Sequence, residues 1–144
     1  MMKLMVFFFV GFVFADGPDA GWIALSGKNA KVTKGESEQC AGGVLNVSSE
    51  AGRTTVQLGS LIHFTYEKSG VAMLAPEGSE DCRAERKVTE IPGGWQRDVS
   101  FSECEDATDN RAYRETLVLK KKVITYERKA AAGDVTAVQC RFKI

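Results

Sequence analysis

The order of apolar and polar residues along the chain alternates with a period of two, and the alternation recurs from Leu45 to the end. No long stripe with the 3.6-residue period of a helix competes with it. In the run 61–66, Ile62, Phe64 and Tyr66 share one face. Comparable runs are 44–48, 95–101, 111–119, 123–127 and 134–144. Each run is expected to form a β-strand with one buried face.

Turn-forming residues separate these runs. Glycine, proline, serine and aspartate cluster at 42–43, 49–52, 69–70, 76–78, 92–94, 106–110 and 132–134. Short strands divided in this way predict an all-β fold, namely a two-sheet, immunoglobulin-like antiparallel sandwich. Little helix is expected, with at most one turn within 80–87.

One predicted strand carries a charge on its apolar face. In the run 95–101, Trp95, Val99 and Phe101 share a face, and Arg97 is the odd member of that face. Trp95 follows Pro-Gly-Gly at the start of the strand. A tryptophan in this position is more often a core anchor than a platform for a ligand.

The N-terminus has the pattern of a secretory signal peptide. Lys3 provides a positive charge, and Leu4 to Phe14 is an apolar run. As a helix this run would rise only about 16 Å, too little for a hydrocarbon core of roughly 30 Å. Val13-Phe14-Ala15 fits a cleavage site, so residues 1–15 are expected to be removed. The protein is therefore expected to be secreted and to lack an integral membrane segment.

The remaining chain has the size of one domain and almost no net charge. The full sequence has 19 basic and 19 acidic residues, and removal of Lys3 changes this balance by one. We therefore expect neither nucleic acid nor an anionic membrane as the partner. Lys120, Lys121 and Lys122 are interpreted as a solvated turn, and a docking patch for a sulfated sugar or an acidic partner is the alternative.

Four cysteines, Cys40, Cys82, Cys104 and Cys140, follow the signal. An even number of cysteines in a small exported chain predicts disulfides rather than metal or redox chemistry. Four cysteines allow three connectivities, and the residues alone do not choose among them. Cys140 falls on the apolar face of the last strand, where a bridge between sheets would lie.

No catalytic, metal or cofactor site is expected. His63 is the only histidine, and it falls on the polar side of its strand. A single histidine needs further ligands to hold a metal, and the cysteines are already assigned to disulfides. Glu103, Glu105 and Asp106 lie in a loop and are interpreted as solvated. We therefore expect a protein without enzymatic activity.

The span 40–144 resembles a ZP-N domain, the N-terminal half of the zona pellucida polymerisation module. Cys40 precedes the short strand Gly-Gly-Val-Leu-Asn-Val, and Cys82 follows a turn in the middle. Cys104 ends Asp-Val-Ser-Phe-Ser-Glu-Cys and is followed by Ala-Tyr-Arg-Glu-Thr-Leu-Val-Leu. The closing Val-Gln-Cys-Arg-Phe, which contains Cys140, is similar to the family's final pattern. Residues 16–39 would then form an N-terminal arm, with the apolar patch 22–25 as a first strand or an attached arm.

The resemblance implies both a disulfide pairing and a function. In the family the bridges join the first cysteine to the fourth and the second to the third, here Cys40–Cys140 and Cys82–Cys104. It implies a free-standing module that binds or assembles through sheet edges or loops in an egg coat or another extracellular matrix, including gamete recognition. The expected partner is the protein itself or another ZP-type extracellular protein. The family often has a glycine after its third cysteine, where this chain has Glu105.

The sequence also contains one candidate site of covalent modification. Asn46-Val47-Ser48 is a sequon for N-glycosylation, and Asn46 faces away from the apolar side of its strand.

The alternative function is a secreted carrier of a lipid or other small apolar ligand, in which Phe64, Phe101 and Phe142 line a cavity between the sheets. A secreted enzyme or a protease inhibitor ranks last, because no constellation of residues supports either.

Overall fold

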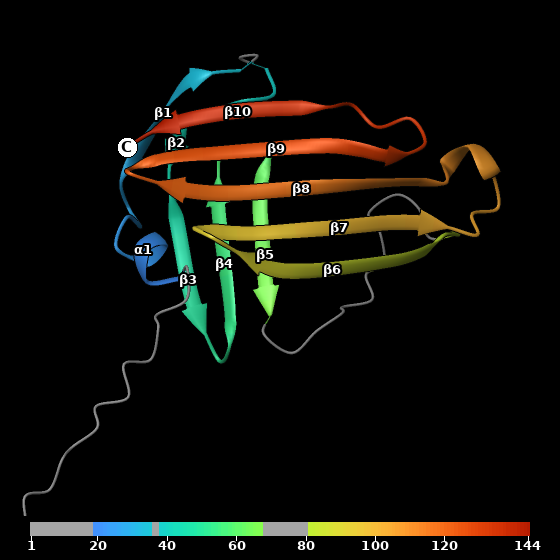
Figure 1. The fold of residues 1–144 in the computed structure, drawn as a ribbon, viewed down its shortest axis with the longest axis horizontal. Helices are drawn as coiled ribbons and strands as arrows, with labels where there is room; N and C mark the ends of the chain where they lie inside the picture. The colour runs from blue at the N-terminus through green and yellow to red at the C-terminus, as the bar shows by residue number, and fades with distance from the viewer. Residues whose placement is uncertain (1–18, 36–37, 68–80) are drawn as a thin grey trace, which may run out of the picture.

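Two antiparallel β-sheets and a short N-terminal helix make up the computed structural model of the chain (Figure 1). The structure describes residues 19–35, 38–67 and 81–144. The expected all-β antiparallel sandwich with two disulfides is confirmed. The predicted signal peptide, residues 1–15, lies outside the described residues.

The larger sheet contains seven strands in the order β2-β1-β10-β9-β8-β7-β6. Its strands are β1 (Asn29–Lys34), β2 (Gly43–Val44), β6 (Arg83–Ile91), β7 (Gly94–Ser102), β8 (Arg111–Lys120), β9 (Val123–Ala132) and β10 (Val138–Lys143). The smaller sheet has the order β3-β4-β5 and consists of β3 (Asn46–Glu50), β4 (Arg53–Leu58) and β5 (Ile62–Glu67). Helix α1 spans Asp19–Ile23, and the 3₁₀ helix η1 (Ala107–Asp109) lies between β7 and β8.

Strands β6 to β10 follow one another as neighbours in the larger sheet, as β3 to β5 do in the smaller one, so both runs are meanders. Strand β1 lies between β2 and the last strand, β10. Leu45 alone separates β2 from β3, and the chain passes there from the larger sheet to the smaller one. The strands of the smaller sheet run across those of the larger sheet (Figure 1). Within the two meanders each strand pairs with the next, which differs from the Greek-key connections of immunoglobulin domains. Strands β1 and β10 pair across most of the chain.

The segment before Cys40 is part of the sandwich. The patch 22–25, expected to be a strand or an arm, begins in helix α1, and β1 follows it and pairs with β10. The alternation of apolar and polar residues does not predict β1, because Ala30 is the one buried residue of that strand. The helical turn expected within 80–87 is also wrong, since the residues from Arg83 onward pair with β7.

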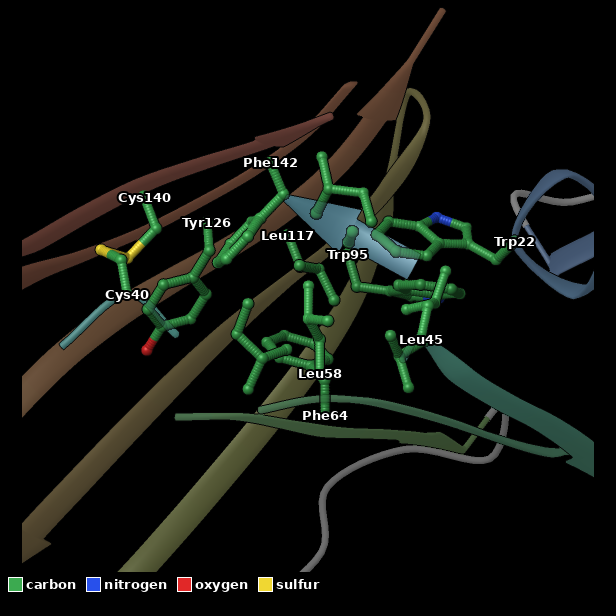
Figure 2. Close-up of a cluster of buried hydrophobic side chains, with 14 of the residues drawn as sticks. Trp22, Cys40, Leu45, Leu58, Phe64, Trp95, Leu117, Tyr126, Cys140 and Phe142 are labelled. Atoms are coloured by element: carbon green, nitrogen blue, oxygen red, sulfur yellow. A yellow bond between two sulfur atoms is a disulfide. The ribbon is translucent and has the colours of Figure 1, made fainter. Parts of the chain in front are cut away.

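The apolar core fills the end of the sandwich next to α1. Figure 2 shows Trp22 of α1 beside Trp95, with Phe64 and Leu58 of the smaller sheet facing Phe142 and Leu117 of the larger one. The Trp22 and Trp95 rings have centroids 5.6 Å apart, and Trp95 is the core anchor that its position predicted. Helix α1 therefore closes this end of the sandwich.

Cys40 is bonded to Cys140, and Cys82 is bonded to Cys104. This is the pairing that the resemblance implies. The first bridge is buried in the core beside Tyr126 (Figure 2). The second lies just beyond the Arg83–Ser102 register pair and so closes the open end of the β6–β7 hairpin.

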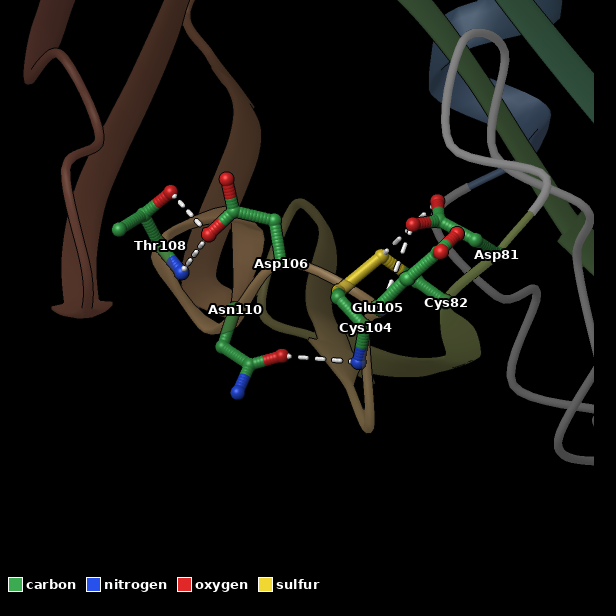
Figure 3. The surroundings of a disulfide bond; sticks show 7 residues. All are labelled: Asp81, Cys82, Cys104, Glu105, Asp106, Thr108 and Asn110. Carbon is green, nitrogen blue, oxygen red and sulfur yellow. Dashed lines mark hydrogen bonds between the residues drawn. A yellow bond between two sulfur atoms is a disulfide. The ribbon is translucent and has the colours of Figure 1, made fainter.

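The surroundings of the second bridge are held by short polar contacts (Figure 3). The Cys104 amide donates to Asn110 Oδ1 at 3.1 Å, and the Glu105 amide donates to Asp81 Oδ2 at 3.3 Å. Asp106 accepts hydrogen bonds from the hydroxyl and amide of Thr108, which lower the pKa of the Asp106 carboxyl.

Across the part of the chain that the structure describes, no helix is long and apolar enough to cross a membrane.

Candidate functional site

The interior of the sandwich has an apolar half and a polar half. On β7 the inner face passes from Trp95 to Arg97, and on β8 it passes from Leu117 to Glu115. Strand alternation places these residues on the inner face. The two strands therefore change together from tight apolar packing near α1 to charged side chains farther along.

A cavity of about 670 Å³ lies over the polar part of the larger sheet, and among the described residues His63 is its one lining residue from the smaller sheet. This volume lies within the range of small-molecule sites in proteins, roughly 300–1,000 Å³. The cavity is lined by His63, Ala84, Glu85, Arg86, Arg97, Val99, Phe101, Arg111, Tyr113, Arg128, Asp134, Val135 and Thr136. The wall thus combines charged groups with two aromatic rings and several small apolar side chains.

Four neighbouring strands each contribute one arginine to this wall. They are Arg86 of β6, Arg97 of β7, Arg111 of β8 and Arg128 of β9. A guanidinium stays protonated in proteins. The acidic groups of the wall do not balance this charge, because Glu85 is bound to Arg83 with 3.0 Å between Oε1 and Nη2. The cavity is therefore cationic in a chain with no net charge.

Arg97 is the arginine that the protein itself neutralises. Its Nη2 lies 2.7 Å from Oε2 of Glu115, and its Nη1 donates to the backbone oxygen of His63 at 3.1 Å. Tyr126 donates to the same Glu115 oxygen at 3.2 Å. The Arg97 guanidinium also lies over the Phe64 ring, 4.3 Å from its centroid. Arg97 thus joins the two sheets.

The other three arginines have weaker partners. Arg111 lies over the Phe101 ring at 4.9 Å, and Arg128 lies 6.0 Å from the Tyr113 centroid. Arg128 Nε donates to the backbone oxygen of Thr136 at 3.1 Å. Among the described residues, none of the three forms an ion pair with a carboxylate.

Burial changes the acid–base properties around the cavity. Removal from solvent, with the Glu115 carboxylate as a further cause, raises the pKa of Tyr113 and of Tyr126. Burial also lowers the pKa of Arg86, and the positive charge of Arg97 adds to this shift. Both tyrosines are therefore neutral donors at physiological pH, while the arginines remain charged.

The residues singled out by sequence are distributed over different parts of the molecule. Phe101 lines the cavity, whereas Phe64 and Phe142 are buried in the packed apolar half. His63 is exposed at the edge of the cavity, and Asn46 is exposed on β3. Glu103, Glu105 and Asp106 are exposed near the second disulfide. Within 19–35, 38–67 and 81–144, no cluster of potential metal ligands is present.

Sequence reasoning noticed Arg97 but missed its companions. Glu115 shares a strand face with Leu117, and Arg128 shares one with Tyr126. A charge at an inward position of an alternating strand was the available signal. Applied to every strand, this signal would have found Glu115, Arg111 and Arg128.

A second hollow, of about 490 Å³, lies at the β3–β4 turn and is lined by residues that include Ser48, Glu50, Arg53 and Glu67. Arg53 there is already paired with Glu67 at 2.5 Å. None of the described residues that line it is aromatic. It offers fewer groups to a ligand than the arginine-lined cavity does.

Comparison with known proteins adds no relative, since no family model, curated protein or solved structure matches the chain. The function is therefore inferred from the geometry of the cavity.

Proposed function

We propose that this protein is a secreted binding protein that holds a small molecule in the arginine-lined cavity. The observation that carries the proposal is the cavity of about 670 Å³, in which charged groups converge beside Phe101 and Tyr113. Small-molecule sites typically combine apolar and aromatic walls with a few placed polar groups.

The cavity is built on well-supported elements. Arg86, Arg97 and Phe101 lie on the β6–β7 hairpin, which the Cys82–Cys104 bridge closes at its open end. Arg97 is fixed by Glu115 and by the backbone of β5. Binding groups that are already ordered lose less entropy when a ligand binds. These supports favour a preformed binding site.

The filled apolar half limits the size of the ligand. Phe64 and Phe142, which a carrier of a long acyl chain would use as cavity walls, are each 1% exposed and belong to the packed core. A long lipid chain would have to displace this core. The proposed ligand is therefore a small molecule that fits beside Phe101.

Secretion is part of the proposal. Disulfides persist in oxidising compartments and are rare in the cytosol of mesophiles, and all four cysteines are paired in the structure. The signal-like residues 1–15 of the sequence support the same location. Glycosylation at the exposed Asn46 would follow from passage through a eukaryotic secretory pathway.

The test is native mass spectrometry of the protein secreted by a eukaryotic cell culture. We expect a bound small molecule that leaves on denaturation. Ala84→Phe, which fills the cavity from β6, should abolish retention, whereas Thr89→Phe on the exposed face of the same strand should not. A wild-type protein that is always empty and whose melting temperature no small-molecule library shifts would refute the proposal.

A second candidate is a ZP-N-like assembly module that binds itself or a ZP-type extracellular protein in an egg coat or matrix. The nested pairing Cys40–Cys140 and Cys82–Cys104 supports it. In the described part of the chain, β6 pairs on one side only and offers an edge for an added strand. Two features weigh against this candidate. Exposed charged residues on the β6 edge disfavour pairing with another strand, namely Arg83, Glu85 and Lys87. The meander order of β6 to β10 is the other feature.

The second candidate is tested by analytical ultracentrifugation of the protein alone and mixed with a purified ZP-type coat protein. A homodimer or a mixed complex would support assembly. A protein that stays monomeric and does not bind the coat protein would exclude the assembly module. The ligand-binding proposal would still stand.

A further inference from the structure

We infer that the ligand of the cavity is a small organic anion with a planar apolar body, its charged group bound by Arg86, Arg111 and Arg128 and its body placed against Phe101 and Tyr113. This inference rests on the proposed function and names the ligand class of the same site.

The first observation is an excess of positive charge. Arg86, Arg111 and Arg128 line one cavity, and none of them pairs with a carboxylate among the described residues. Like charges that line one cavity repel one another. A negatively charged ligand would relieve this repulsion.

Two of the nearby acidic groups are already engaged by other side chains. Glu115 binds Arg97 and Tyr126. Glu85 binds Arg83, its neighbour two positions along β6 and therefore on the same strand face, opposite Arg86. Asp134 lines the cavity from the exposed loop between β9 and β10 and supplies one negative charge, against the three charges of Arg86, Arg111 and Arg128. The cavity thus retains positive charge after these groups are counted.

Strand register places the binding groups in adjoining rows. Arg86 lies opposite Val99, which in turn lies opposite Tyr113. Two positions along β7, Phe101 lies opposite Arg111. Each of these two rows therefore carries one arginine and one aromatic residue, so one ligand would contact both kinds of group.

Arg128 completes the arginine set from β9. It lies opposite Glu115 in the register, but its Nε donates to the Thr136 backbone oxygen instead. Nε of Arg86, like Nε of Arg97, is buried without a hydrogen-bond partner. These guanidinium groups are free to bind a carboxylate, sulfate, sulfonate or phosphate, the groups whose geometry an arginine fork matches.

The aromatic rings indicate the rest of the ligand. Phe101 and Tyr113 have ring centroids 6.5 Å apart and an interplanar angle of 41°. Arg111 lies over the Phe101 ring and Arg128 over the Tyr113 ring, so rings and arginines form one mixed surface. Planar groups pack favourably on aromatic rings. Because the apolar half of the sandwich is filled, the body of the ligand must be compact.

The experiment uses two fluorescent probes that share an aromatic body. One is 1-anilinonaphthalene-8-sulfonate, and the other is neutral N-phenyl-1-naphthylamine. We expect saturable binding of the sulfonate at one site per chain and at least tenfold weaker binding of the neutral probe, since hydrogen bonds to a charged group are the strong ones.

Variants locate the anion site. Arg86→Gln and Arg111→Gln should each raise the Kd of the sulfonate about tenfold and leave the neutral probe unchanged. The matched control is Arg114→Gln, which removes an arginine from the outer face of the same strand as Arg111. Circular dichroism verifies folding, and Arg111→Lys replaces any variant that fails to fold.

The outcomes separate the two proposals. Equal binding of both probes, insensitive to Arg86 and Arg111, would overturn the anion inference and leave a cavity that binds small molecules. Failure of both probes, together with an empty protein in native mass spectrometry, would overturn the proposed function itself.

Discussion

Arg97 and Glu115 form an ion pair with 2.7 Å between Nη2 and Oε2, and only 13% and 5% of their side chains are exposed. The pair lies across β7 and β8 where the apolar core meets the cavity. Tyr126 from β9 and the His63 backbone from β5 also contact it. One pair of charges therefore connects four strands in two sheets.

Glu115→Ala should destabilise the protein by about 3–5 kcal/mol, because Arg97 would remain buried without a counter-charge. Urea unfolding followed by far-UV circular dichroism measures the loss. Asp98→Ala, which breaks the exposed pair with Arg114, is the control and should cost about 0.2–1 kcal/mol. Similar losses for the two variants would contradict the structural role of the buried pair.

Replacing both partners should cost less than the sum of the single changes. In Arg97→Met combined with Glu115→Leu, no buried charge remains unpaired. A double-mutant cycle should therefore give an interaction energy of about 1–3 kcal/mol. Additive effects would show that the two side chains act independently.

Alkaline pH should weaken folding through the tyrosines. The pKa values of Tyr66, Tyr113 and Tyr126 are all raised, with burial as the main cause. The folded state then retains protons that the unfolded chain loses above about pH 10. This stabilisation is complete below about pH 10 and declines as the pH rises further, and Tyr126 contributes most because its pKa is raised most.

Urea unfolding between pH 8.5 and 11 measures this decline. Tyr126→Phe should reduce the slope, because the phenol with the largest shift is gone. Ultraviolet titration of the native protein should show tyrosine ionisation later than in 8 M urea. Coincident titration curves for the folded and unfolded protein would disprove the expected dependence.

The strands were predictable from sequence where burial is one-sided. Val138, Cys140 and Phe142 of β10 alternate with exposed residues, and the structure buries all three. Such positions carry their own signal, because the side-chain period of a strand is two. The long, regular strands of the larger sheet were visible for the same reason.

Helix α1 and the cavity were not predictable in this way. The patch around Trp22 has no period that separates helix from strand, and its helical form depends on packing against Trp95. Arg97 looked out of place in its strand because its partner, Glu115, lies 18 residues away on β8. The register of two strands decides such a pairing, and local sequence does not contain it.

The two disulfides should differ in their contribution to stability. Cys40–Cys140 spans 100 residues and Cys82–Cys104 spans 22. In the chain-entropy model the bridges that close these loops add about 4–5 and about 3 kcal/mol, respectively, to the free energy of unfolding. We expect the Cys40→Ala, Cys140→Ala double variant to unfold at lower urea than the Cys82→Ala, Cys104→Ala one. The reverse order would show that strain or residual structure outweighs loop length.

Asn46 should carry a glycan when the protein passes through a eukaryotic secretory pathway. The side chain is exposed on β3, and Ser48 completes the sequon. Intact-protein mass spectrometry before and after treatment with a glycosidase should show the loss of one glycan. Asn46→Gln and Ser48→Ala should both remove it, with less than about 0.5 kcal/mol change in stability. A wild-type mass that the glycosidase leaves unchanged would contradict the prediction.

Trp22 closes the apolar end of the sandwich, and its removal should be among the most damaging single changes. It is fully buried, and its Nε1 donates to the Gly93 backbone oxygen at 3.0 Å. Trp22→Ala should cost about 3–5 kcal/mol through the cavity that it leaves. Ile23→Ala, at the exposed neighbouring position, should change stability by less than about 0.5 kcal/mol. If urea unfolding gave equal midpoints for the two variants, α1 would not be a structural cap, and the core would be held by the sheets alone.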